Sequence, residues 1–295
     1  MDTLIEVKTS GLPKKEAERG AELVFAEFQR IDKLMSRYQE ESSLSDFNNR
    51  TELAHPVDPE LYELLMESVR VSRQSQGAFD VTIEPLLTLY SFDERSPRIP
   101  SEAALKSALS KIGYQKLSFE DNYRINSTSL ELRLDLGAIA KGYALKRAAA
   151  GLERAGFRNF LINAGGDILT RGQKKDGSKW RLGIRNPRGL GIIGKFEVTN
   201  TSVVTSGDYE RFFFRDGQRI HHLLDPRNGR PASLCRSVTV VYEDAALADA
   251  YATAIFVLGP NEGMRLAEKI EGLQVLIIST DGTITSGGGF SYEAK

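Results

Sequence analysis

Two oxygen-bearing side chains lie four residues apart in the segment EDAALADAYATAIFVLG, which covers residues 243–259. On a helix, Asp249 and Thr253 share one face, and Ala252 lies beside them. Alanines and large apolar residues surround the pair and predict a largely buried helix, where an unpaired carboxylate is costly. The segment therefore predicts a cation next to Asp249. The alternative is structural: Asp249 offsets the helix dipole, and Thr253 bonds back to the preceding turn.

A carboxylate and a hydroxyl are oxygen ligands, which a hard ion such as Mg²⁺ prefers. Protein sites for Mg²⁺ often supply few ligands and share the ion with phosphate groups of a substrate. Asp249 and Thr253 therefore predict a magnesium site that needs a phosphate-bearing ligand to complete it.

The segment LRLDLGAIAKGYALKRAAAGLERAG, residues 132–156, predicts a strand that ends at Asp135 and a helix over 138–155. Its small residues leave the backbone carbonyls around Ala138 lightly shielded. The N–H groups at the start of such a helix are suited to a phosphate. We therefore expect a phosphate-bearing ligand near Asp135.

Two further turns of small residues, NAGGD at 163–167 and TSGDYERF at 205–212, would let a ligand approach the main chain. Ordinary turns between strands explain both segments equally well.

His222 is a candidate proton acceptor, because its unperturbed pKa is about 6.5. A structural role after the Asp-Gly turn at 216–217 is an equal alternative. His221 is the weaker candidate because neighbouring residues of a strand point to opposite faces. His55 precedes a proline in a predicted loop, and we expect it at the surface.

Helical periodicity and capping signals place several helices between these motifs. The first spans 14–34, with an apolar stripe of Ala21, Val24, Phe25, Phe28, Ile31 and Leu34. The others begin after Asp58 and Ser101, span 138–155, and run over about 245–258 and 261–271.

Short apolar or alternating segments predict β-strands in the second half of the chain. Asp-Gly pairs at 216–217 and 281–282 predict tight hairpin turns. We predict one α+β domain over 1–295, with mainly antiparallel sheets flanked by helices. A variant of this prediction is a domain of two lobes with a nucleotide site between them. The strand segments are NFLINAGG, DILTRG, KWRLGIRN, GKFEVTN and SVVTSG.

Composition excludes several classes of function. With 39 basic and 40 acidic residues, the chain lacks the positive field that drives binding to nucleic acid. One cysteine, Cys235, rules out an internal disulfide and a cysteine-rich zinc site. GLGIIG at 189–194 matches a dinucleotide fingerprint but stands between a turn and a strand, so we expect a hairpin loop there.

Seven ordered blocks along the chain resemble the ApbE family, the FAD:protein FMN transferases. Together they span nearly the whole sequence, and each block alone would be a weak signal. The blocks are MSRYQEESSLSDFN (35–48), GAFDVTIEPL (77–86), LDLGAIAKGYA (134–144), INAGGDI (162–168), TSGDYERFF (205–213), HHLLDPRNGRPA (221–232) and ADAYATAIFVLG (248–259).

The resemblance implies an ApbE-like fold and a reaction in which FMN from FAD passes to a Thr or Ser hydroxyl, with Mg²⁺ as cofactor and AMP as product. It implies Asp249 and Thr253 as metal ligands, with main-chain oxygens near Ala138 and Ala252, and His222 and Asp249 as catalytic residues. The residues implied to line the FAD site are Met35, Asn48, Ala78, Phe79, Asp80, Asp135, Lys141, His222 and Leu223.

The resemblance also implies a protein partner with a Ser-Gly-Ala-Thr-type acceptor motif, typically a subunit of a membrane redox complex. It implies a place on the outer face of a bacterial cytoplasmic membrane, behind an export signal or lipid anchor that the 295 residues do not contain. Two alternatives remain at this point. The chain could hydrolyse FAD to FMN and AMP, because water can replace the acceptor hydroxyl, or it could carry FAD without turnover.

Overall fold

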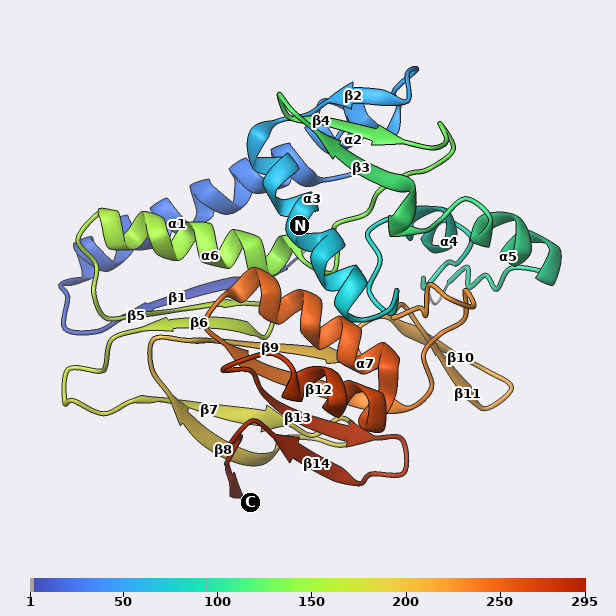
Figure 1. Ribbon diagram of the computed structural model, residues 1–295. Coiled ribbons are helices and arrows are strands. Elements are labelled where there is room, and N and C mark those ends of the chain that lie inside the picture. Colours follow the sequence, from blue (N-terminus) through green and yellow to red (C-terminus); the bar gives the residue numbers. More distant parts are fainter. Residues whose placement is uncertain (1–2, 94) are drawn as a thin grey trace.

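A computed structural model describes residues 3–93 and 95–295. In this part of the chain, seven strands form a central sheet in the order β1-β5-β6-β9-β12-β13-β14, and every neighbouring pair is antiparallel (Figure 1). The strands are β1 (Ile5–Thr9), β5 (Phe160–Ala164), β6 (Asp167–Arg171), β9 (Ser202–Gly207), β12 (Cys235–Tyr242), β13 (Gln274–Ser279) and β14 (Ile284–Gly287). The predicted α+β class with mainly antiparallel sheets is confirmed.

Helices cover one face of the central sheet, and a second sheet covers the other (Figure 1). Apolar residues of the helices and the sheet form the main core, and a separate apolar cluster joins the two sheets. The large helices are α1 (Lys14–Met35), α3 (Pro59–Gln74), α6 (Ala140–Arg154) and α7 (Ala245–Glu268). The second sheet comprises β15 (Glu293–Ala294), β8 (Ile192–Val198) and β7 (Trp180–Arg185).

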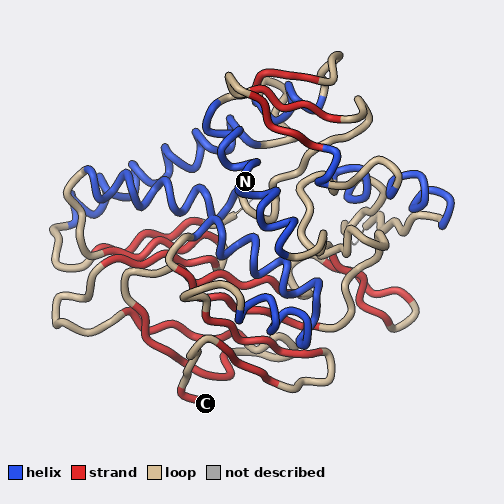
Figure 2. The backbone as a smooth tube through the Cα atoms, in the orientation of Figure 1, coloured by secondary structure: helices blue, strands red, loops and turns tan. Residues whose placement is uncertain are grey.

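Smaller elements extend the molecule beyond these layers (Figure 2). A small sheet has the order β2-β4-β3, and β10 pairs with β11 in a hairpin whose turn is the predicted Asp216-Gly217. The elements are α2 (Ser43–Asn48), β2 (Ala54–Pro56), α4 (Glu84–Leu87), α5 (Glu102–Leu109), η1 (Tyr114–Lys116), β3 (Leu117–Glu120), β4 (Arg124–Ser127), β10 (Phe212–Arg215) and β11 (Gln218–His221).

Most predicted elements are found where the sequence placed them. The Asp58 side chain caps α3 by accepting a hydrogen bond from Glu60. Strand β8 begins at Ile192, inside the GLGIIG segment, so only the first half of that segment is loop. The predicted stripe of α1 was too wide, however. Phe25 is 41% exposed, and the buried positions are Gly20, Val24, Phe28, Ile31 and Met35.

The strand predicted to end at Asp135 is wrong. Residues 132–136 are extended but join no sheet, and α6 begins at Ala140 rather than at residue 138. The side chain of Asn48 replaces a neighbouring strand: its Oδ1 accepts from the N–H of Leu134 at 2.7 Å, and its Nδ2 donates to the Leu134 carbonyl at 2.9 Å. One amide group thus satisfies backbone atoms that a sheet would otherwise pair.

Helices α6 and α7 approach each other closely at Gly142. A Cβ atom at this position would lie 2.1 Å from the carbonyl oxygen of Ala245 and 2.8 Å from Cβ of Asp249. Only a residue without a side chain fits there. Further along, the helical backbone of α7 is interrupted at Gly259, where φ is 80° and ψ is 178°, and Pro260 follows, so α7 consists of two helices that meet at a kink. This confirms the two helical segments predicted at about 245–258 and 261–271, although the second ends at Glu268.

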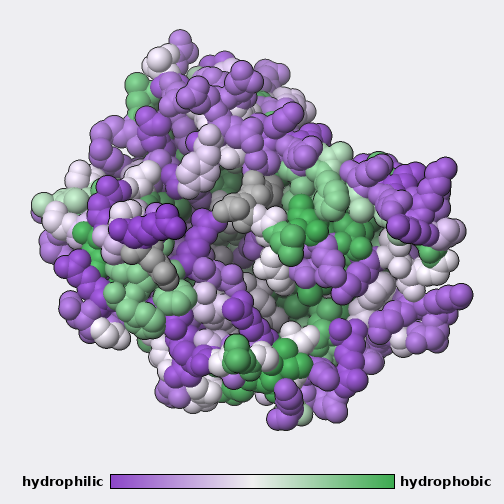
Figure 3. All heavy atoms as spheres, turned by 180° about the vertical axis from the view of Figure 1, so that it is seen from behind, coloured by the Kyte–Doolittle hydropathy of each residue, from purple (hydrophilic) through white to green (hydrophobic). Residues whose placement is uncertain are grey.

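The face seen from behind carries hydrophilic residues over most of its area, with smaller hydrophobic regions between them (Figure 3). Among the helices of the described residues, none combines the length and apolar character needed to cross a membrane.

Gly142→Ala should lower the free energy of unfolding, at the upper end of the about 1–3 kcal/mol typical of overpacked sites, because its methyl group would press on backbone atoms of α7. Gly151→Ala on the same helix is the control, since only the end of Arg154 lies near its Cβ position, at 3.9 Å. It should be neutral or stabilising by about 0.5–1 kcal/mol. Urea unfolding measures both, and equal effects would contradict the close approach at Gly142.

Candidate active site

Three charged side chains from distant parts of the sequence meet where α6, β6 and α7 come together. Lys141 lies in the first turn of α6, Asp167 begins β6, and Asp249 lies one turn into α7. The ammonium of Lys141 forms an ion pair with Oδ2 of Asp167. Asp167 is 1% exposed and Asp249 is 5% exposed. If both acids are ionised, two carboxylates against one ammonium leave one buried negative charge without a partner.

The charges shift one another's pKa values. Burial raises the pKa of Asp249 to about 7, and the negative charge of Asp167 acts in the same direction, while Lys141 and the N–H of Gly142 oppose both. Burial also raises the pKa of Asp167. For Lys141, burial works against the charged form, but the carboxylates of Asp167 and Asp249 outweigh it and raise its pKa. Lys141 therefore stays protonated. A cation beside Asp249 would favour the ionised form of the Asp249 carboxylate.

The start of α6 is arranged around Asp249. The N–H of Gly142 donates to Oδ2 of Asp249 at 2.9 Å. Because α6 begins at Ala140, this N–H is one of the first in the helix, and such groups have no acceptor within the helix. Asp249 supplies the acceptor, and Ala138 lies before the helix, outside its regular hydrogen-bond ladder.

Thr253 lies one turn after Asp249 in α7 and is half-buried. Its hydroxyl lies 3.3 Å from that of Ser206 in β9. Ala252 lies in the regular part of α7, where its carbonyl belongs to the helical hydrogen-bond ladder. Of the two predicted main-chain ligands, the local structure therefore favours Ala138.

These groups fit a hard cation by their chemistry. Asp249 supplies a buried carboxylate, Thr253 a hydroxyl and Ala138 a carbonyl, all of them oxygen ligands. The described residues contain no group of three or more His, Cys, Asp or Glu side chains that could hold a metal. A site here would thus rest on one carboxylate, neutral oxygens and a ligand from outside the chain.

The two neighbouring histidines have different surroundings, as predicted. His221 is buried, its Nε2 lies 2.8 Å from the carbonyl of Ala232, and its ring meets Phe256 edge-on. His222 follows β11, and its Nδ1 lies 3.3 Å from the carbonyl oxygen of Arg211. Because a carbonyl only accepts, Nδ1 carries the proton in this contact and Nε2 keeps a free lone pair.

Burial lowers the pKa of His222 to about 4, and the nearby His221 acts in the same direction. His222 is therefore neutral near pH 7 and able to accept a proton, although a low pKa makes it a weak base.

Asp135 is held by an ion pair that the sequence did not reveal. Its Oδ2 lies 2.6 Å from Nε of Arg37, and its Oδ1 accepts from the N–H of Gly137 at 2.8 Å. Arg37 also reaches Glu84, at 3.3 Å. These contacts fix the turn that leads into α6.

The other predicted FAD residues are largely buried, in α1, α2 and the segments that follow α3 and β11. Asp80 accepts hydrogen bonds from Thr82 and Tyr114, and burial raises its pKa. Asn48 holds residues 132–136, as described above. The remaining members, with exposures of 8% or less, are Met35, Ala78, Phe79 and Leu223. Their contact with FAD stays a prediction.

Sequence reasoning did not select Asp167 or Arg37 as site residues. Asp167 closes the NAGGD turn, so its position after two glycines was a signal that could have been used. Arg37 lies in the segment MSRYQEESSLSDFN (35–48), and its spacing from other charged residues does not mark it as a site residue. Only the fold brings it to Asp135.

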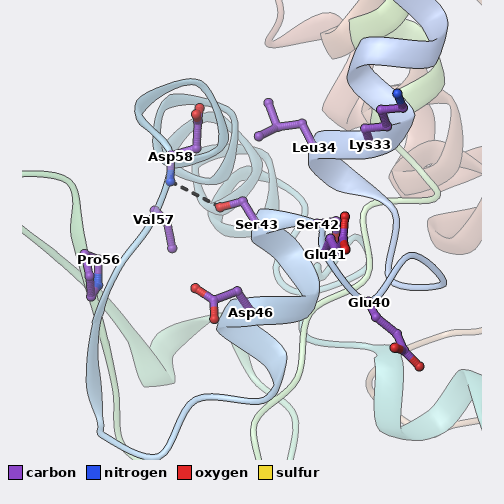
Figure 4. A pocket seen from close by; sticks show the side chains of 10 residues that line it. All are labelled: Lys33, Leu34, Glu40, Glu41, Ser42, Ser43, Asp46, Pro56, Val57 and Asp58. Atoms are coloured by element: carbon purple, nitrogen blue, oxygen red, sulfur yellow. Dashed lines mark hydrogen bonds between the residues drawn. The ribbon is translucent and has the colours of Figure 1, made fainter.

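A separate hollow of about 500 Å³ lies between α1, α2 and the start of α3 (Figure 4). Its lining includes the acids Glu40, Glu41, Asp46 and Asp58, and Ser43 accepts a hydrogen bond from the N–H of Asp58 at 3.2 Å. Lys141, Asp167 and Asp249 do not line it. The hollow is therefore distinct from the charged cluster.

Comparison with known proteins identifies relatives along the full length of the chain. A sequence profile of the ApbE family matches residues 1–277. The FAD:protein FMN transferase of Escherichia coli is 30% identical over 298 residues, which cover 95% of this chain and 85% of that protein. The crystal structure of the ApbE protein from Thermotoga maritima has a TM-score of 0.87 at 32% identity and covers 97% of this chain and 96% of the other. For the apo flavinyl transferase ApbE of Pseudomonas stutzeri, the TM-score is 0.83 at 32% identity, with 97% and 95% covered.

The pKa of His222 can be measured by NMR titration of its ring protons, and we expect a value near 4 rather than 6.5. Between these values the unfolded chain binds more protons than the folded one, so protonation of His222 should lower stability as the pH falls from about 6.5 to 4. His222→Asn lacks this group and should lose less stability over that range in urea unfolding. A ring that titrates near 6.5 would show that His222 is not desolvated.

Proposed function

The chain belongs to the ApbE family, and on that basis we propose that it transfers FMN from FAD to a Thr or Ser hydroxyl of an acceptor protein, with Mg²⁺ as cofactor and AMP as product. The names of the relatives support flavin transfer. The observation that carries the magnesium proposal is the buried charge balance of Lys141, Asp167 and Asp249.

Asp249, Thr253 and the carbonyl of Ala138 would hold the ion. When bound there, Mg²⁺ would neutralise charge on phosphate oxygens and favour attack at phosphorus. Lys141 remains charged beside this position and supplies a further positive charge toward a diphosphate.

In the proposed reaction, the acceptor hydroxyl oxygen forms a bond to the phosphorus nearer the flavin. The bond from that phosphorus to the bridging oxygen breaks, and AMP leaves with the bridging oxygen. His222 is placed to take the hydroxyl proton on Nε2, because its Nδ1 is turned to the carbonyl of Arg211. Alignment and charge stabilisation supply most of the rate enhancement in such transfers.

Hydrolysis of FAD to FMN and AMP uses the same groups, with water in place of the acceptor hydroxyl. Binding of FAD without turnover is the third possibility. The relatives named as transferases favour transfer over both.

We further propose that the acceptor carries a Ser-Gly-Ala-Thr-type motif and belongs to a membrane redox complex. The proposed location is the outer face of a bacterial cytoplasmic membrane. Both proposals rest on the family alone.

A mass assay separates the three functions. The protein is incubated with FAD, Mg²⁺ and a synthetic peptide that contains Ser-Gly-Ala-Thr, and the peptide is weighed by mass spectrometry. We expect the peptide to gain the mass of FMN less one water, with AMP in equal amount. Free FMN with unmodified peptide would indicate hydrolysis, and bound FAD without AMP would indicate a carrier.

Substitutions at Thr253 test the metal proposal. Thr253→Val keeps the shape but removes the hydroxyl, whereas Thr253→Ser keeps it. Thr253→Val should lower the apparent affinity for Mg²⁺ in AMP release by roughly 10–100-fold, the range typical of damaged metal sites, and Thr253→Ser should change it little. Asp249→Ala should abolish release that depends on Mg²⁺. Circular dichroism and thermal melting control for folding, and unchanged Mg²⁺ dependence in folded Thr253→Val would remove Thr253 from the ligands.

A further inference from the structure

Two buried carboxylates of the site have different partners. Asp167 is paired with the ammonium of Lys141, whereas Asp249 accepts a hydrogen bond from the N–H of Gly142. Both acids are almost fully buried, so their charges are poorly screened by water. The carboxylate that forms the ion pair with Lys141 is neutralised, and the other one remains available to a metal ion.

Backbone donors fix the positions of both carboxylates. The N–H of Thr205 in β9 donates to Oδ1 of Asp167 at 3.2 Å, and the N–H of Gly142 donates to Oδ2 of Asp249 at 2.9 Å. Lys141, by contrast, carries its charge at the end of a flexible four-carbon stem. Of the three charged groups, the ammonium is thus the one that stands on a flexible side chain and, in the described part of the chain, is paired only with Asp167.

Lys141 is attracted to both acids. Asp167 is the stronger electrostatic partner of its ammonium, and Asp249 is the next. If Asp167 lost its charge, Asp249 would become the main attraction for Lys141. An ammonium beside Asp249 would cancel the negative charge on which a cation site there depends.

We propose that Asp167 is a positioning residue that holds Lys141 away from Asp249 and so reserves Asp249 for the metal ion. The inference deepens the proposed function and rests on it, because that function assigns the ion to Asp249. Asp167 itself makes no contact with the ion in this arrangement. Its carboxylate forms an ion pair with Lys141 and so balances the charge of the ammonium.

The test measures binding of Mn²⁺, as a substitute for Mg²⁺, to the full chain by electron paramagnetic resonance without FAD. Asp167→Asn keeps the acceptor for Thr205 but loses the charge, and it should weaken Mn²⁺ binding by roughly tenfold or more. The double variant Asp167→Asn with Lys141→Gln removes the competing ammonium as well. Its affinity should return to within roughly threefold of the wild type, because the ammonium that competes with Mn²⁺ for Asp249 is no longer present.

A matched control uses the ion pair between Lys146 and Asp244, which joins the same two helices at 2.6 Å. Asp244 also caps α7, and asparagine caps a helix equally well. Asp244→Asn should therefore leave the affinity for Mn²⁺ unchanged. Thermal melting of each variant confirms that it is folded.

The outcomes separate the positioning role from its alternatives. If the double variant binds Mn²⁺ as weakly as Asp167→Asn alone, Asp167 is itself a ligand and the positioning role is wrong. Unchanged binding in Asp167→Asn would also overturn it. A wild-type chain that binds no Mn²⁺ would instead count against the metal assignment of the proposed function.

Discussion

The candidate site depends on an imbalance of charge: of the two buried carboxylates, Asp167 is paired with the ammonium of Lys141, and Asp249 has only the N–H of Gly142 as a partner among the described residues. Buried charges are tolerated in proteins when they are paired, and here the pairing is incomplete. Burial, together with the negative charge of Asp167, raises the pKa of Asp249 to about 7. A cation beside Asp249 would favour its ionised form.

The fold places these charges through one close approach between helices. Because Gly142 has no side chain, α6 can come near enough to α7 for its N–H to reach Asp249. That hydrogen bond satisfies an N–H in the first turn of α6 and orients the carboxylate. A single glycine therefore links helix packing with the orientation of Asp249.

Similarity to the ApbE family and the geometry of the site support each other in different ways. The relatives supply the type of reaction, since they are named flavin transferases. The structure supplies the arrangement on which the proposal rests, a buried carboxylate at Asp249 and a protonated Lys141 paired with Asp167. Neither Asp167 nor Arg37 was selected by family motifs as a site residue, yet both hold residues that were.

The sequence by itself determined the class of fold, most helices and hairpins, and the position of Asp249 and Thr253 one turn apart on one helix, because each follows from local periodicity, capping or turn chemistry. It could not determine that residues 132–136 stay outside every sheet, since the amide of Asn48 binds them from far along the chain. It also could not show that Lys141 pairs with Asp167, or that Phe25 lies at the surface. Such facts depend on contacts between residues distant in sequence, and only the tertiary structure decides which of those residues meet.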